Sequence, residues 1–362
     1  MERILAELTG IAEGVRTLEE KRQKLGSFLR EIKNVRISKD SDILETQMAI
    51  QVTPDPLKRL RAAGVDGGLV RHAYHAVDLI LTRAVAAVFD YTDARLSNVT
   101  YFPDPLATPR LSVITDPYSE TEFMHSADIE RMLTEVEVLS GVRALNPDLV
   151  LADGSLVPHP SSRPKKDSPT WNRYAELLEK YRNLFADANA LAGVIEDSRS
   201  THFSEMISNK ILGSVDAPNV KELQTLLVRT RDTNLLFHVL RPGERSFVFR
   251  LGNPETNPVM ADLGDASRNL YAFYLRTVEY DRPIRVEFYS KDAPVRAAER
   301  LASLILPMSS QNQEYGIPAV IIEADARAKL REEELSAIHS YIVDCVGDLP
   351  SLYRLRRDSR PF

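Results

Sequence analysis

Two short apolar runs that end in an Asp-Gly pair constrain this sequence more than any other feature. The run Leu149–Ala152 is too short for a helix and leads to Asp153, so it indicates a buried strand that presents this carboxylate at its end. A second run, Ala63–Val65, leads to Asp66 in the same way. The glycine after each Asp leaves room for a phosphate or another backbone to approach. Two carboxylates at neighbouring strand ends would form an oxygen-rich site suited to Mg²⁺ or Mn²⁺, although each Asp-Gly alone is also typical of a simple turn.

The composition is that of a soluble protein with one large domain or two modest ones, at 362 residues, 43% hydrophobic and 27% charged. No apolar run is long enough to cross a membrane and the amino terminus does not resemble a signal peptide, which predicts a cytoplasmic location. The single cysteine, Cys345, excludes an internal disulfide and a cysteine-based zinc site within one chain. A net charge of −6 argues against a uniformly basic nucleic-acid surface but leaves room for a local basic channel.

The first 34 residues carry apolar side chains at three- and four-residue spacing, which predicts a long amphipathic helix, broken near Gly26. Its apolar stripe from Ile4 to Ile32 can pack on its own domain, or it can dock on a second subunit or another protein. We therefore divide the chain into an N-terminal helical segment, residues 1–45, and a main domain, residues 46–362.

The order of elements after this helix predicts a mixed α/β fold. Leu57–Asp90 is expected to form two strands, of which the first ends at Asp66, and a third strand follows to complete an antiparallel meander. A helix starting near Ser126 carries Glu130, Glu135 and Glu137. The pattern from Ser204 to Leu240 is mainly helical, with an extended segment at Leu235–Leu240 as the alternative for its end. The other expected elements are helices at Trp171–Ala192, Pro294–Leu306 and Asp325–Val346, and strands at Gly193–Ile195, Phe247–Leu251, Leu270–Leu275, Ile284–Tyr289 and Pro318–Ile322.

Acidic residues follow several of these strands, at Asp66, Asp153, Glu196-Asp197 and Glu323 to Asp325. Such a carboxylate cluster could bind a divalent metal that orients a water and neutralises charge during phosphodiester hydrolysis. The Pro- and Ser-rich loop of residues 157–170 contains Lys165 and Lys166, which could contact backbone phosphates or simply form a solvated surface. No phosphate-binding loop, CxxC pair or GxSxG motif is present, which removes P-loop ATPases and serine hydrolases.

The ordered set Val65-Asp66-Gly67-Gly68, a Glu-bearing helix, Leu149 to Leu156 and Gly193-Val194-Ile195 resembles the NurA nuclease family. The resemblance covers the chain from about Leu57 and implies an RNase H-like mixed sheet flanked by helices. It also implies a homodimeric, Mn²⁺- or Mg²⁺-dependent 5′-to-3′ exonuclease and single-strand endonuclease that acts on DNA with the hexameric HerA translocase in end resection. On this resemblance, Asp66 and Asp153 match the metal-binding carboxylates, and Glu135 matches the helix Glu, with Glu137 as the alternative.

Two positions depart from the family pattern. Glu196 stands where the family commonly has Lys, and the nearby Arg199 could take over its contact with a phosphate. Asp325 stands where the family commonly has His, and it could serve as an oxygen ligand for the metal or as the N-cap of the closing helix.

Two rival functions remain open at the level of the sequence. One is a catalytically weak NurA-like subunit that docks on a DNA-translocating ATPase through its terminal helices. The other is a metal-dependent phosphatase that acts on small molecules, although no compact ligand-binding motif supports it.

Overall fold

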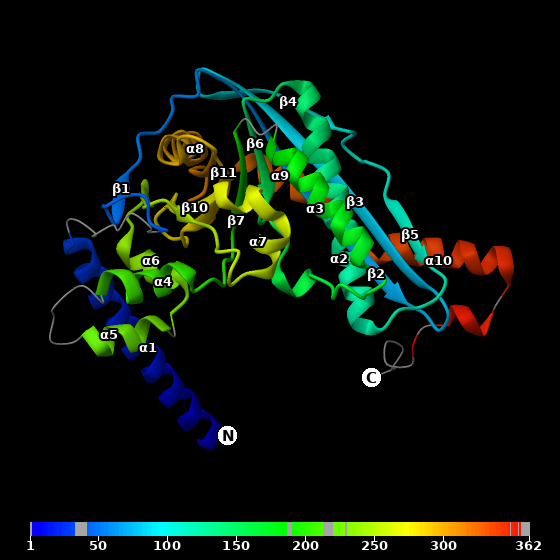
Figure 1. Cartoon of the computed structure of the whole chain (residues 1–362), viewed down its shortest axis with the longest axis horizontal. Coiled ribbons are helices and arrows are strands. Elements are labelled where there is room, and N and C mark those ends of the chain that lie inside the picture. Colours follow the sequence, from blue (N-terminus) through cyan, green and yellow to red (C-terminus); the bar gives the residue numbers. More distant parts are fainter. Residues whose placement is uncertain are drawn as a thin grey trace. The chain divides into compact units, whose positions relative to one another are not determined.

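The computed structural model describes residues 2–32, 42–186, 190–212, 220–228, 230–347, 349–353 and 355 (Figure 1). The chain forms two compact units, each assembled from three segments. The first unit contains Met1–Asp55, Val194–Leu251 and Tyr271–Pro318, and the second contains Pro56–Gly193, Gly252–Leu270 and Ala319–Phe362. Among the described residues, no helix is both long and apolar enough to cross a membrane.

The second unit is built on a mixed sheet. Strands β2 (Arg59–Ala73) and β3 (Asp78–Thr92) pair antiparallel along their whole length. Two further strands, β4 (Arg95–Phe102) and β5 (Arg110–Ile114), pair antiparallel with β3, and β6 (Leu149–Asp153) pairs parallel with β2. The predicted meander is confirmed, but the prediction that the first strand ends at Asp66 is wrong, because β2 continues to Ala73. Asp66 is therefore a mid-strand residue.

Helices cover both faces of this sheet. Helix α2 (Glu120–Gly141) packs Phe123 and Ala127 against one face, where Leu69 of β2 also points. The other face carries Val70 of β2, which packs with Leu335 of α10 (Glu332–Val346). Successive strand residues point to opposite faces, so odd-numbered residues of β2 face α2 and even-numbered residues face the C-terminal helices. This alternation decides which carboxylates can meet.

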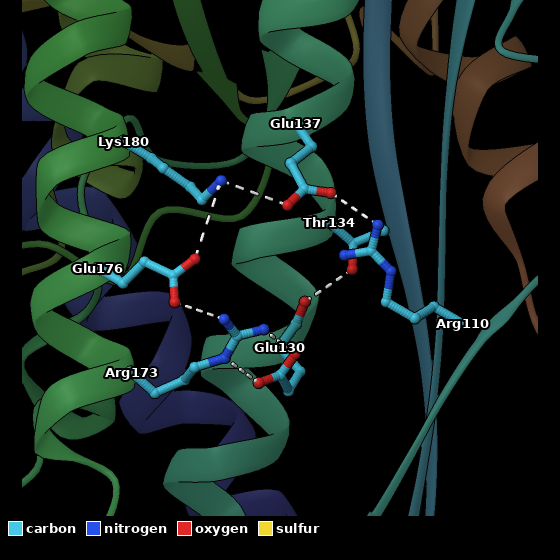
Figure 2. Close-up of polar contacts among 7 residues, drawn as sticks. All are labelled: Arg110, Glu130, Thr134, Glu137, Arg173, Glu176 and Lys180. Atoms are coloured by element: carbon cyan, nitrogen blue, oxygen red, sulfur yellow. Dashed lines mark hydrogen bonds and ion pairs between the residues drawn. The ribbon is translucent and has the colours of Figure 1, made fainter.

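The longest helix over the sheet starts earlier than its sequence indicates. Ser119, rather than a residue near Ser126, is the N-cap of α2, and its hydroxyl accepts a hydrogen bond from the Glu122 N–H. Helix α3 (Trp171–Ala186) lies beside α2, and ion pairs join the two helices (Figure 2). These pairs and their neighbours involve Arg110, Glu130, Glu137, Arg173, Glu176 and Lys180.

The segment predicted as the last strand is a helix, α9 (Ala319–Ala328). Its buried residues Val320, Ile321, Ala324 and Ala328 recur at helical spacing, whereas a run of four apolar residues alone does not distinguish a strand from a helix. The predicted closing helix Asp325–Val346 is accordingly two helices, α9 and α10. This unit also contains the short helix α7 (Pro258–Leu263) and the first three residues of strand β7 (Leu191–Ile195), which pairs with β6.

The first unit has a core of packed helices and strands. Its strands are β1 (Ala49–Gln51), β8 (Glu244–Ser246), β9 (Phe249–Arg250), β10 (Leu270–Arg276) and β11 (Ile284–Tyr289). Its helices are α1 (Glu2–Glu31), α4 (His202–Met206) continuing into a π-turn at Ile207–Ile211, α5 (Val220–Val228), α6 (Asp232–Val239) and α8 (Pro294–Ser309). The extended segment considered at Leu235–Leu240 is mostly the helix α6.

Helix α1 is continuous through Gly26, so the expected break there is wrong. A Cβ at Gly26 would lie 2.6 Å from the Cβ of His238, which shows that the glycine allows α1 to approach α6 closely. Leu25 and Leu29 of α1 are buried in the core of this unit. The C-terminal half of the amphipathic helix therefore packs internally.

Candidate active site

Asp66 and Asp153 lie on neighbouring parallel strands at the same level. Val65 of β2 is in register with Ala152 of β6, and each Asp follows its residue directly. Neighbouring residues in register point to the same face of a sheet. Both carboxylates therefore extend from the face opposite α2. The predicted strand end at Asp153 is confirmed, and the chain turns there through Gly154, which has a φ of +99°.

Helix α9 runs along β2 on this face and brings Asp325 to Asp66. A Cβ at Gly64 would lie 2.4 Å from the carbonyl oxygen of Val320, and a Cβ at Gly68 would lie 2.2 Å from that of Ala328. These two glycines bracket Asp66, so the middle of α9 lies over it. The side chain of Asp325 lies close enough to Asp66 to raise its pKa.

The pKa of Asp66 is raised above its ordinary value. Burial is the main cause, and the neighbouring Asp325 adds to it through its charge. Burial and a neighbouring carboxylate both favour the neutral form of Asp66, so a cation bound here would have to stabilise its charged form.

Glu135 reaches the same level of β2 from the opposite face. It lies on α2, and a Cβ at Gly67 would be 2.4 Å from its Cγ. The absence of a side chain at Gly67 thus makes room for the Glu135 carboxylate. Burial raises the pKa of Glu135 to about 7, and the charge of Asp66 contributes to this rise.

Arg131, which the sequence analysis missed, forms an ion pair with Glu135 one helical turn along α2. The charge of Glu135 is the main cause of a raised pKa of Arg131, and Asp66 and Asp128 add to it. The positive charge of Arg131 acts on both carboxyl groups, because it lowers the pKa of Glu135 and that of Asp66. Its spacing of four residues from Glu135 on a helix was the signal that could have revealed it.

Glu137, the alternative helix carboxylate, lies elsewhere. Its side chain bonds to Arg110 of β5 at 2.7 Å and to Lys180 of α3 at 3.4 Å (Figure 2). Figure 2 shows it within the ion pairs that join α2, α3 and β5. The structure therefore places Glu135, and not Glu137, beside Asp66 and Gly67.

The basic residues predicted to bind DNA are divided between the units. Lys165 and Lys166 belong to the second unit, in the loop that precedes α3, and the Lys166 ammonium lies 5.9 Å from the centre of the Trp171 ring. Arg199 belongs to the first unit, as does Glu196, whose carboxylate accepts a hydrogen bond from the Tyr315 hydroxyl. The site described here is built from residues of the second unit alone.

The donor set of this site suits a hard divalent cation. Asp66, Asp153 and Asp325 supply carboxylate oxygens on one face of β2, and such oxygens are the ligands that Mg²⁺ and Mn²⁺ favour. In the part of the chain that the structure describes, no group of three or more His, Cys, Asp or Glu side chains is close enough to hold a metal. Glu135 is instead directed to Arg131, and Asp66 to Asp325.

A family model described as the NurA domain matches residues 60–330, which include the whole candidate site. The chain belongs to the NurA family. Its fold is similar to the crystal structure of the NurA nuclease from Sulfolobus solfataricus, with a TM-score of 0.57 and 13% identity, covering 96% of this chain and 97% of the other. No curated protein matches the chain.

Two further NurA crystal structures share the fold. One has a TM-score of 0.52 and 9% identity, and covers 98% of this chain and 100% of the other. The second, described as NurA with manganese, has a TM-score of 0.50 and 10% identity, and covers 97% of this chain and 99% of the other. The mixed α/β fold predicted from the sequence is confirmed, and family membership supports a nuclease activity.

Proposed function

We propose that this NurA-family protein is a divalent-metal-dependent deoxyribonuclease whose site is centred on Asp66. The observation that carries this proposal is the position of four carboxylates around one level of β2, with Asp66, Asp153 and Asp325 on one face and Glu135 reaching over Gly67 from the other. The raised pKa of Asp66, caused by burial and by the charge of Asp325, is typical of carboxylates that are brought together at a functional site.

Asp66 and Asp153, joined by Asp325, would hold Mn²⁺ or Mg²⁺. When bound, such an ion lowers the pKa of a water and neutralises charge on the phosphodiester oxygens. Glu135, with a pKa of about 7, is suited to accept a proton from the attacking water at neutral pH. Arg131 carries the positive charge that can compensate the phosphate as its partner Glu135 is protonated.

The finer properties are proposals that rest on the family resemblance. They are 5′-to-3′ exonuclease and single-strand endonuclease activity, a homodimer, and action with a HerA-type hexameric translocase in DNA end resection. Lys165 and Lys166, in the loop before α3, and Arg199 are proposed to contact DNA phosphates.

The experiment that tests the activity uses labelled single- and double-stranded DNA with Mn²⁺, Mg²⁺ or EDTA. Asp66→Asn and Asp153→Asn should each reduce cleavage by at least about 100-fold, since each removes an anionic metal ligand without changing the side-chain shape. Asp167→Asn, an exposed residue in the loop before α3, is the matched control and should cleave at the wild-type rate. Wild-type cleavage by either site variant, or in EDTA, would contradict the proposal.

A docking role is a second candidate function, because the first half of α1 leaves apolar side chains in solvent. Ile4, Leu8, Ile11 and Val15 are 54–63% exposed. We propose that this stripe binds a HerA-type ATPase or a second copy of the chain, whether or not the subunit is an efficient nuclease.

A further inference from the structure

A groove with basic walls lies at the end of α9, outside the carboxylate site. Its charged lining consists of Arg83, Arg327, Lys329, Arg331, Glu333 and Glu334. Four positive groups thus face two negative ones, although the whole chain has a net charge of −6. The groove has a volume of about 680 Å³, which is within the usual range for ligand sites.

Two of these arginines are fixed by their partners. The guanidinium of Arg83 is buried and donates to the Glu334 carboxylate at 2.6 Å and to the backbone carbonyl of Lys329 at 3.2 Å. Arg327 pairs with Glu323 at 2.8 Å and lies 4.9 Å from the centre of the Tyr101 ring. The contacts of Arg83 tie the link between α9 and α10 to β3, and the two carboxylates compensate the charges of both arginines.

Lys329 and Arg331 are the cations that these contacts leave for a ligand. Both side chains are exposed, and neither takes part in an ion pair within the residues that the structure describes. They alternate along the short link between α9 and α10, one on each side of the buried Leu330. Leu330 packs into the core with Val70 and Leu335, so the link that carries the two cations is anchored.

The groove begins next to the carboxylate site. Arg327 and Asp325 lie on the same helix, and the backbone N–H of Lys329 donates to the carbonyl of Asp325 at 3.0 Å. The carbonyl of Ala328 lies against Gly68, two residues from Asp66 on β2. Two strand residues span roughly 7 Å, so the groove begins about that far from Asp66 along β2.

We infer that this groove binds the sugar-phosphate backbone of a single nucleic-acid strand, with Lys329 and Arg331 contacting phosphates next to the one at Asp66. This inference rests on the proposed nuclease function for its substrate. The charge of the groove, its fixed walls and its start beside Asp325 fit a polyanion that passes from the carboxylate site along the α9–α10 link. Backbone contacts of this type are independent of base sequence.

Binding of a fluorescently labelled single-stranded oligonucleotide, followed by anisotropy in EDTA over a range of salt concentrations, tests the inference without cleavage. The double variant Lys329→Gln/Arg331→Gln should bind more weakly, and the slope of log K against log salt should fall by about 1.4, which is 0.7 for each lost phosphate contact. The charge-conserving variant Lys329→Arg/Arg331→Lys should keep the wild-type slope, which excludes loss of folding as the cause.

The matched control removes two exposed charges from the same unit, at the other end of the β2–β3 pair. Lys58→Gln/Arg95→Gln should leave the slope at the wild-type value. A Lys329→Gln/Arg331→Gln variant with the wild-type affinity and slope would overturn the inference that this groove binds the nucleic-acid strand. Failure of the wild type to cleave DNA in Mn²⁺ or Mg²⁺ would instead overturn the nuclease function, so the two failures are distinguishable.

Discussion

Asp325 reaches the carboxylate site from α9. We propose that it binds the metal, whereas the structural alternative is that it caps a helix. The alternative of an N-cap is wrong, because Asp325 lies within α9 and the N-cap of the following helix is Arg331. We predict that Asp325→Ala raises the Mn²⁺ concentration needed for half-maximal cleavage by about tenfold or more, since one anionic ligand is lost. Asp325→His should retain much of the rate, because imidazole also binds Mn²⁺, and should shift the preference from Mg²⁺ toward Mn²⁺.

The measurement is cleavage of single-stranded DNA against the concentration of each metal. Ile322→Ala, an exposed position on the same helix, serves as the control for general effects on α9. If Asp325→Ala lowers the melting temperature but leaves the activating Mn²⁺ concentration unchanged, Asp325 supports the fold of α9 and is not a ligand.

Glu135 gives the site a predicted pH dependence. Its pKa of about 7 lies above the ordinary value of 4.5, so below pH 7 a proton neutralises the carboxylate and removes a negative charge that acts on the neighbouring Asp66 and favours a cation there. Mn²⁺ affinity, measured by calorimetry without DNA, should therefore fall as the pH drops from 7 to 5.5, by up to about tenfold per pH unit for one displaced proton.

Two variants separate Glu135 from the other carboxylates in this measurement. Glu135→Gln should bind Mn²⁺ with a shallower dependence on pH, because the titrating group is absent. Glu137→Gln should keep the wild-type profile, since Glu137 is engaged with Arg110 and Lys180. Identical profiles for the wild type and Glu135→Gln would show that the charge of Glu135 does not influence the cation site.

The sequence predicted some residues of the site correctly and missed others. Asp153 follows a short apolar run, and this pattern indicated its place at a strand end correctly. Asp66 lies inside a strand of 15 residues, so the predicted strand end there was wrong, whereas the close approach that its glycines were expected to allow is seen with α2 at Gly67 and α9 at Gly68. Arg131 was missed because an Arg four residues before a Glu is also the pattern of an exposed ion pair on any helix.

At the scale of elements, the glycines of β2 make the site possible by allowing α9 to approach. We predict that Gly64→Ala lowers the free energy of unfolding by about 1–3 kcal/mol, because its Cβ would lie 2.4 Å from a backbone carbonyl that cannot move alone. Gly10→Ala is the control, and it should change the free energy of unfolding in the opposite direction. It lies in α1 with no atom within 4 Å of the added Cβ, and should stabilise by about 0.5–1 kcal/mol.

Denaturant unfolding measures both changes. A Gly64→Ala protein as stable as the wild type would show that α9 can move away from β2 at little cost. In that case its cleavage rate becomes informative, since displacement of α9 would also carry Asp325 away from Asp66.

The elements that the sequence predicted best are those with a long or alternating apolar pattern. β3, β10 and β11 were found near their true bounds, as was the body of α3. The segment that became α9 was misassigned because Pro318–Ile322 contains four consecutive apolar or alanine residues, and such a run packs equally well as a strand. As a helix it packs against Gly64 and Gly68 of β2, which are far away in the sequence and which no local window includes.

For the whole molecule, each compact unit collects three segments that are far apart in the chain. Local patterns predicted a mixed sheet with flanking helices, because strand and helix periodicities are local. Local patterns do not indicate which distant segments share a core. The sequence set residues 1–45 apart as a helical segment, whereas in the structure they belong to the first compact unit together with residues 194–251 and 271–318.

The exposed half of α1 yields the last prediction. Ile4, Leu8, Ile11 and Val15 are spaced by four, three and four residues, the pattern of a helix that pairs with another helix, and they are exposed while Leu25 and Leu29 are buried. Substituting these four residues by Ser should therefore abolish association with a HerA-type ATPase or a second copy without lowering the melting temperature. Removal of the first 34 residues would instead also remove Leu25 and Leu29 from the core of the first unit.

Pull-down with the ATPase and the molar mass in solution distinguish the two occupants of this stripe. Loss of the ATPase with an unchanged mass assigns the stripe to the translocase, and a halved mass assigns it to a second copy. Glu13→Ser/Lys24→Ser, two exposed polar positions on the same helix, should change neither measurement. A four-Ser variant that retains both interactions would show that α1 contributes to this molecule only through its buried C-terminal half, where Leu25 and Leu29 anchor it to the core of its own unit.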